Sequence, residues 1–197
     1  ISNFDLAFFS LNNAGLSITF DYAGAIPDSA CNQRTLMTSV TIGSTITSIG
    51  ASAFIGCSGL TTITIPSSVT SIGERSFDGC SGLTTITIPD SVTSIGDNAF
   101  QNCSALTSVT ISNSITSIGN TAFQNCTNLT LVTIGSSLTT IGNNAFLNCN
   151  NLTVAIANNQ LTVTEANSTL TGTVFGIAAA NNTVTIDFAT NAAAKAL

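Results

Sequence analysis

Apolar and polar residues alternate along this chain in a pattern that returns every 23 residues. Within one copy, Leu60, Ile63 and Ile65 follow the pattern L-x-x-I-x-I, and Val69 and Ile72 follow shortly afterwards. Strand side chains alternate between the two faces of a sheet, so Ile63 and Ile65 are expected to share the core face. The pattern therefore predicts two short extended segments per copy, with serines and threonines facing outward.

The period extends through most of the chain. Five good copies span residues 34–148, and a degenerate sixth copy covers 149–157. A fixed period of this length is typical of solenoids, in which each copy contacts only its neighbours. We therefore predict a single leucine-rich-repeat solenoid of stacked parallel β-strands. Residues that occupy the same position in successive copies are called a column. The clearest columns are Cys57, Cys80, Cys103, Cys126 and Cys149; Gly50, Gly73, Gly96, Gly119 and Gly142; and Phe54, Phe77, Phe100, Phe123 and Phe146.

The connections within a copy are expected to be short. Pro66 cannot donate to a ladder and should end the first strand. Gly73 is expected at a turn that a side chain would block. Ser76 and Phe77 are expected in a short 3₁₀ or helical turn that places the ring in the core.

The two ends of the chain depart from the repeat. Residues 1–33 are expected to form an N-terminal cap that covers the first copy, with a strand at Leu16–Tyr22 and with Cys31 inside it. Residues 158–197 are expected to form a C-terminal β cap and tail, with strands at 161–165 and 183–188. The chain starts without a basic segment or Met, so a signal peptide is either already removed or the chain is a fragment.

Composition narrows the function classes. The formal net charge is −6, only three residues are Lys or Arg, and 6% of residues are charged. Phosphate binding needs clustered Lys and Arg, so a nucleic-acid partner is not expected. An anionic membrane surface is excluded by the same reasoning. No apolar run reaches 18 residues, so no transmembrane segment is expected.

The sequence contains no histidine. That removes Ser-His-Asp triads, Cys-His pairs and the commonest zinc ligands. We therefore predict no catalytic, cofactor-binding or metal-binding residues, and no enzyme activity. Glu74, Asp78 and Asp97 are interpreted as solvated charges, with a calcium site as the alternative.

The cysteine column is interpreted as a line of buried free thiols. Zinc or iron–sulfur binding needs thiolates that converge from several directions, whereas the members of a column point the same way. Disulfides between neighbouring copies are disfavoured by the distance between parallel side chains. Cys31 and Cys57 are the one pair that could bridge, if the cap folds onto the first copy.

The segment LTTITIPDSVTSIGDNAFQNC, Leu83 to Cys103, closely resembles the repeat of the BspA-like leucine-rich-repeat family over its whole length. The resemblance covers about residues 34–157. Gly43, Ser112 and Gly135 stand where the family repeat has proline. The resemblance implies a secreted or cell-surface protein of a bacterium or protist, often an adhesin, and it supplies no shared binding residue.

The most informative exposed feature is an array of threonines on the outward strand positions. It is expected to be either a solvated sheet face, suited to the β propensity of threonine, or a partner-binding face. The leading prediction is adhesion to a protein or glycan of a host cell, the matrix or a neighbouring subunit. A structural repeat of a surface layer, filament or virion, with self-assembly, is the alternative, and ice binding is a lesser one. The candidate partner-binding residues are Thr41, Thr62, Thr64, Thr85, Thr87, Thr110 and Thr133.

Overall fold

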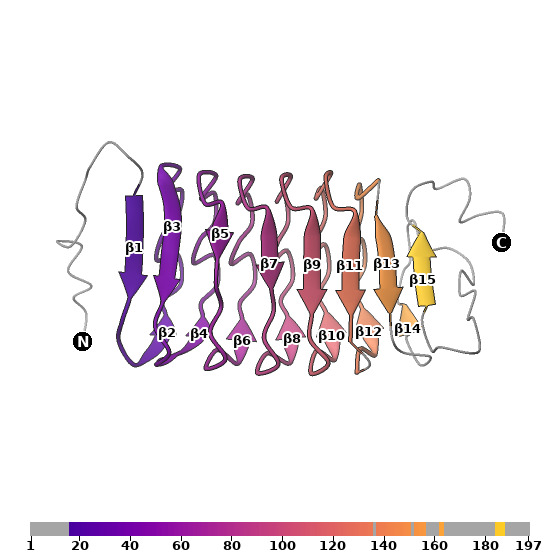
Figure 1. Ribbon diagram of the computed structural model, residues 1–197, viewed down its shortest axis with the longest axis horizontal. Coiled ribbons are helices and arrows are strands. Elements are labelled where there is room, and N and C mark those ends of the chain that lie inside the picture. Colours follow the sequence, from indigo (N-terminus) through magenta and orange to yellow (C-terminus); the bar gives the residue numbers. More distant parts are fainter. Residues whose placement is uncertain (1–15, 136, 151, 157–161, 164–183, 188–197) are drawn as a thin grey trace.

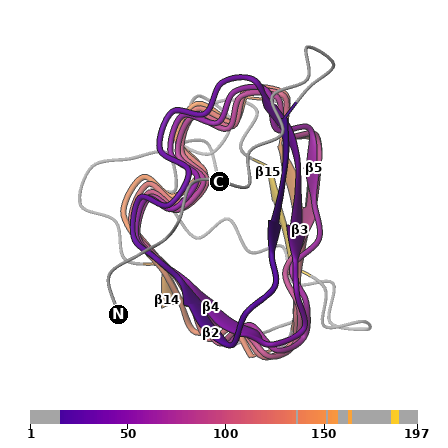
Figure 2. The same ribbon diagram turned by 90° about the vertical axis from the view of Figure 1, so that its left-hand side faces the viewer.

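The protein is a stack of similar coils, each contributing a strand to one or both of two faces. The computed structural model describes residues 16–135, 137–150, 152–156, 162–163 and 184–187. Figure 1 shows the coils following one another along a nearly straight axis, and they superimpose when viewed along that axis in Figure 2. The predicted solenoid of stacked parallel strands is confirmed.

The first face carries the L-x-x-I-x-I strands. It consists of a three-stranded sheet of order β1-β3-β5 and a five-stranded sheet of order β15-β13-β11-β9-β7. All pairs on this face are parallel except β13 with β15. The strands are β1 (Leu16–Phe20), β3 (Met37–Ile42), β5 (Thr62–Ile63), β7 (Thr85–Thr87), β9 (Ser108–Ile111), β11 (Leu131–Ile134), β13 (Thr153–Ile156) and β15 (Val184–Asp187).

The second face carries the short extended segments that follow the proline position. It is one seven-stranded sheet of order β14-β12-β10-β8-β6-β4-β2, and all of its pairs are parallel. Its strands are β2 (Gly24–Ile26), β4 (Ile46–Ile49), β6 (Ser71–Ile72), β8 (Ser94–Ile95), β10 (Ser117–Ile118), β12 (Thr140–Ile141) and β14 (Thr162–Val163).

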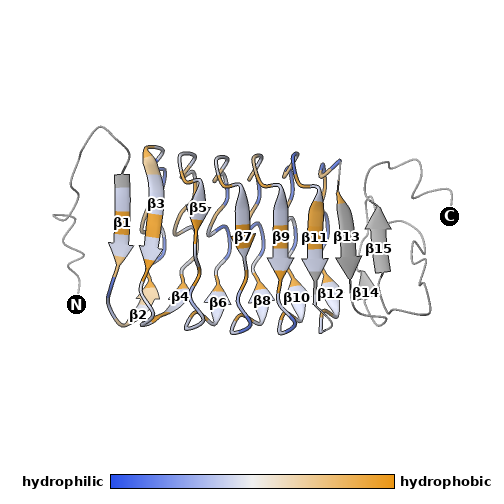
Figure 3. Ribbon diagram, in the orientation of Figure 1, coloured by the Kyte–Doolittle hydropathy of each residue, from blue (hydrophilic) through white to orange (hydrophobic). Residues whose placement is uncertain are grey.

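The core lies between the two faces and repeats coil by coil. Leu60, Ile63 and Ile65 are buried, as are Val69 and Ile72 from the second segment, so the predicted inward positions are confirmed. In Figure 3, hydrophobic and hydrophilic stretches recur at the same place in successive coils. The phenylalanines form a continuous stack, in which the rings of Phe54, Phe77, Phe100, Phe123 and Phe146 follow one another with centroids 5.2 Å apart.

The turns that carry the phenylalanines are not helical. The described residues contain no α-helix or 3₁₀ segment, so the 3₁₀ or helical turn predicted at Ser76–Phe77 is wrong, and these residues form a simple turn. Arg75 and Gly79 have positive φ on either side of Phe77, which prevents a helical run. Their N–H groups, like that of Phe77, donate to carbonyls of the following coil at 2.8–2.9 Å.

The glycine column is required by space and not by backbone conformation. Positive φ among the described glycines is confined to Gly24, Gly56 and Gly79. A Cβ at Gly96 would lie 2.9 Å from the amide nitrogen of Glu74 in the preceding coil. Two coils can approach this closely only because neither side chain nor Cβ stands between them.

The N-terminal end begins with a coil that the 23-residue period does not detect. β1 pairs with β3 and β2 pairs with β4, so both sheets continue into residues 16–26. The N–H of Cys31 donates to the carbonyl of Ala53, as the N–H of Phe54 donates to that of Ser76, so Cys31 occupies a phenylalanine position. Phe20 contacts the ring of Phe54 edge-on, with centroids 5.9 Å apart. That residues 1–33 cap the stack remains a proposal.

The C-terminal end is described only in part. β14 and β15 lie within the two segments predicted as strands, and both are shorter than predicted. β15 runs antiparallel to β13, which departs from the parallel order of the stack. Residues 164–183 and 188–197 lie outside the described residues, and the C-terminal cap also remains a proposal.

Candidate functional site: the outward strand face

The outward positions of the first face carry two adjacent columns of hydroxyl residues. Pairing in register brings Thr110 beside Thr87 and Thr133. The neighbouring column is also in register, with Ser108 beside Thr85, but Leu131 interrupts its hydroxyls and is 45% exposed. All seven candidate residues are exposed, as their outward assignment requires: Thr41, Thr62, Thr64, Thr85, Thr87, Thr110 and Thr133.

A third threonine column borders this face and was missed in the sequence. Its hydroxyls donate to the carbonyl of the same column one coil earlier, as Thr84 does to Thr61 at 3.3 Å and Thr107 does to Thr84 at 3.1 Å. These bonds fix the side chains and add a polar ladder to the backbone ladder. The threonine that recurs every 23 residues at this position is the signal that could have revealed it. The column consists of Thr38, Thr61, Thr84, Thr107 and Thr130.

The second face has the same construction, which the sequence analysis also overlooked. Thr70 donates to the carbonyl of Thr47, and Thr116 to that of Thr93, at 3.1 and 3.2 Å. Ser71 and Ser94 lie beside this column and are exposed. The protein therefore presents hydroxyl columns on both faces of the stack.

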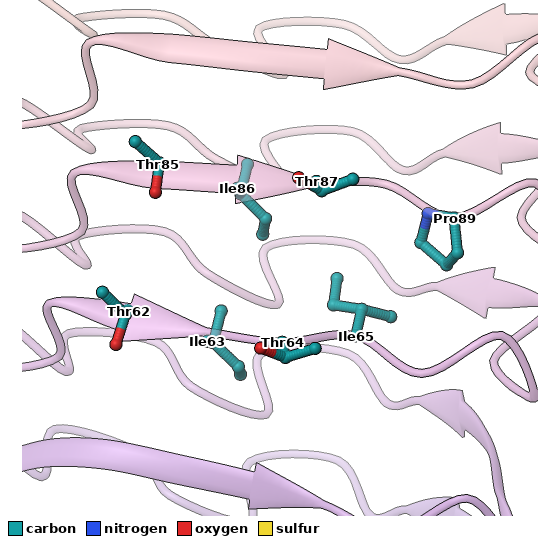
Figure 4. A pocket seen from close by; sticks show the side chains of 8 residues that line it. All are labelled: Thr62, Ile63, Thr64, Ile65, Thr85, Ile86, Thr87 and Pro89. Carbon is teal, nitrogen blue, oxygen red and sulfur yellow. The ribbon is translucent and has the colours of Figure 1, made fainter.

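A groove of about 290 Å³ interrupts the first face between β5 and β7. These two strands belong to different sheets, although the N–H of Thr84 still donates to the carbonyl of Thr61 at the start of the strands. Figure 4 shows the lining side chains on two successive coils. They are Thr62, Ile63, Thr64 and Ile65 on one coil and Thr85, Ile86, Thr87 and Pro89 on the next.

Apart from Asp187 at the end of β15, the charged residues in the described part of the chain lie off this face, on the turns and connections. Asp78 was predicted to face solvent, and this is wrong, because it is 5% exposed. Its carboxylate accepts two bonds from the guanidinium of Arg75, at 2.9 and 3.1 Å, and one from the amide of Asn102 at 2.9 Å. A buried carboxylate needs such partners, and these bonds occupy it.

Asp97 is also held within the stack. Its carboxylate accepts from the backbone N–H and the side-chain amide of Asn120 in the next coil, at 2.7 and 3.0 Å. Among the described residues, no three His, Cys, Asp or Glu side chains gather as metal ligands would. Asp78 and Asp97 therefore act as acceptors that join coils.

All six cysteines are buried free thiols in the structure, including Cys31 and Cys57. The thiol of Cys80 donates to the carbonyl of Phe54 and that of Cys103 to the carbonyl of Phe77, both at 3.2 Å. Burial raises the pKa of Cys57 from 9.0 to about 11 and that of Cys31 to about 12. A neutral buried thiol is a poor nucleophile and metal ligand, so these cysteines are structural.

No helix in the described part of the chain has the length and apolar character needed to cross a membrane.

Similarity to solved structures supports the fold. A leucine-rich repeat protein of T. pallidum is 25% identical with a TM-score of 0.72, and the match covers 76% of this chain and 73% of that one. A leucine rich cell surface protein of Faecalibacterium prausnitzii A2-165 is 32% identical with a TM-score of 0.53, and the match covers 73% of this chain and 48% of that one. A leucine-rich repeat protein of Eubacterium ventriosum, 20% identical with a TM-score of 0.57, shares the fold over 76% of this chain and 55% of its own.

A search of curated proteins finds no match. The family model described as BspA type leucine rich repeat region matches residues 24–153 in 6 copies. Together with the stacked coils and their repeated columns, this match shows that the chain belongs to the BspA-type leucine-rich-repeat family.

Proposed function

We propose that this protein is a non-enzymatic, secreted or cell-surface recognition protein that binds a protein or glycan through its outward strand face. The observation that carries the proposal is the regular, uncharged array of exposed threonines in register on successive strands. A broad face of this kind fits a macromolecular partner better than a small molecule. The absence of histidine and the occupied carboxylates favour binding over catalysis.

The family and one relative support the proposed location. The resemblance to BspA-like proteins implies display outside the cell, and the similar protein of F. prausnitzii is described as a cell surface protein. Adhesion to a host cell or to matrix is the activity that such a location and such a face support together.

The test places two positive charges on the face. The double variant Thr64→Lys/Thr87→Lys should fold normally, because exposed substitutions usually change stability by about 0.5 kcal/mol or less. It should weaken adhesion to cells or matrix, because desolvating two unpaired charges opposes close contact. The matched control is Ser71→Lys/Ser94→Lys, which places the same charges on exposed positions of the second face. Equal adhesion by the wild type and both variants would contradict the proposal.

A structural role is the second candidate. Within the described part of the chain, β15 ends its sheet and pairs antiparallel with β13, and its outer edge is the place where a neighbouring chain could add a strand. Concentration-dependent assembly in light scattering would favour this role, whereas a dispersed monomer that binds cells would favour the adhesin.

Ice binding is the lesser candidate. Alternate threonines on one strand are about 6.7 Å apart and adjacent strands about 4.8 Å apart, which gives a regular lattice of hydroxyl and methyl groups. The exposed Leu131 and the groove between β5 and β7 interrupt that lattice. Shaping of ice crystals by the wild type, lost in Thr64→Lys/Thr87→Lys, would select this function.

A further inference from the structure

The groove between β5 and β7 has a cause in the sequence. In the column that precedes the second segment, the N–H groups of Gly43 and Gly135 donate to carbonyls of the preceding coil, at 2.8 and 3.2 Å. Pro66 and Pro89 occupy this column in two successive coils and have no N–H to donate. The missing N–H of Pro89 would face the coil of β5, and the ladder on the first face is interrupted between β5 and β7, where the groove lies.

The opening reaches the apolar core. Ile63 and Ile65, which line the groove, are 7% and 6% exposed, so a small part of each core side chain is accessible from it. Thr62 and Thr85 stand at the rim, and the hydroxyl of Thr85 points toward the neighbouring coil, as Figure 4 shows. The groove therefore combines an aliphatic floor with a rim that can accept and donate hydrogen bonds.

The volume of the groove and the absence of charge among its lining residues indicate which side chains it can hold. About 290 Å³ is at the lower limit of pockets that hold small molecules, and it suits one large side chain. None of the lining residues is charged, so a Lys, Arg, Asp or Glu side chain would lose its hydration without gaining a partner. Tyr and Trp have an apolar ring with one polar group and are the side chains most often found as anchors in such pockets.

We propose that the groove is an anchor pocket that takes one Tyr or Trp side chain of a protein partner. The proposal rests on the proposed function, since it places the strongest contact of the recognition face and selects a protein over a glycan. The ring lies on Ile63 and Ile65, and the polar group of the ring meets the threonine rim.

Indole and p-cresol, which represent the two side chains, are the probes. Each is titrated into the full chain with labelled methyl groups, and binding is followed by NMR. Saturable shifts are expected at the methyls of Thr62, Thr85 and Ile65. Pro89→Gly supplies the missing N–H, closes the ladder, and should weaken binding of both probes roughly tenfold or more. Pro66→Gly is the matched control, because Pro66 does not line the groove, and it should leave binding unchanged.

A peptide library displayed on phage then tests the class of partner. Selection on the wild type, with removal of clones that bind Pro89→Gly, should enrich peptides that carry Tyr or Trp. The absence of saturable shifts in the wild type, equal shifts in Pro89→Gly, or enriched peptides without an aromatic residue would each overturn the proposal. The fragment titration does not depend on adhesion, so failure of the adhesion test would contradict the proposed function and leave the titration result standing.

Discussion

At the scale of single residues, position within the repeat decides whether a side chain contributes to stability or faces solvent. Phe100 is fully buried between two parallel rings, whereas Thr87, in the same copy, is exposed. These assignments could be made from the sequence, because alternation along a strand and the fixed period together determine whether a side chain points inward or outward. Asp78 was misplaced because its partners, Arg75 and Asn102, come from its own turn and from the next coil.

Phe100→Ala should lower the free energy of unfolding by about 3–5 kcal/mol, through lost burial and a cavity between Phe77 and Phe123. Chemical denaturation measures the change. Unaltered stability would show that the ring is not part of the core.

Ser76→Ala should leave stability unchanged or increase it. Ser76 is fully buried in a column otherwise filled by alanine, and its hydroxyl has no hydrogen-bond partner among the described residues. An unsatisfied buried hydroxyl costs about 1–3 kcal/mol, which the substitution removes. Ser91→Ala is the contrast, because the hydroxyl of Ser91 donates to the carbonyl of Val69, and it should destabilise by about 0.5–1.5 kcal/mol. Thermal melts of both variants would refute the explanation if Ser76→Ala were the less stable one.

The buried thiols predict loss of stability in alkali. Burial raises the pKa of Cys57 to about 11 in the folded chain, from an ordinary value of 9.0. Between these values the folded state holds a proton that the unfolded state has lost, so the stabilisation is complete below pH 9 and is lost as pH rises toward 11. Cys57→Ala should show a smaller decline in urea stability over this range than the wild type. An equal decline in both proteins would argue against the thiol as its source.

At the scale of the elements, the sequence predicted the strands well and the turns poorly. The strands could be predicted from side-chain periodicity. The turns depend on the sign of the backbone angle φ, which side-chain periodicity does not reveal. Asn102, Asn125 and Asn148 have positive φ, which asparagine favours, and could have been recognised. Arg75 and Thr121 also have positive φ, which could not be predicted from their residue types.

The division of the first face into two sheets was also not predicted. Pro66 was expected to end its own strand, but the effect of a missing N–H at Pro89 on pairing with the preceding coil was not predicted. The groove is therefore a property of the contact between two repeats and not of either one alone.

Gly96→Ala should destabilise the stack by about 1–3 kcal/mol or more, because the new Cβ would contact the backbone of Gly73 and Glu74 at 3.0 Å or less. Gly79→Asn is the matched control. It stands in the column where Asn102 and Asn125 have positive φ, and it should be tolerated. If both glycine variants lost stability equally in denaturant titrations, backbone conformation and not crowding would explain the column.

At the scale of the whole molecule, the same repeat builds two different features. Its inward positions form a continuous core, and its outward positions form a lattice of hydroxyls on the surface. The chain has only 6% charged residues, and the described surface is polar mainly through threonine, serine and asparagine. The solenoid and its family could be predicted from the sequence because the copies reinforce one another. The partner could not, because the same repeat positions satisfy solubility and recognition alike.

The most direct test of this account compares Phe100→Ala with Thr64→Lys/Thr87→Lys in two measurements, the melting temperature and the adhesion to cells or matrix. Phe100→Ala should lower the melting temperature by several degrees, with adhesion retained while the protein is folded. Thr64→Lys/Thr87→Lys should keep the melting temperature and lose adhesion. A double variant that unfolds early, or one that adheres as the wild type does, would contradict the claim that the outward strand face is the recognition surface.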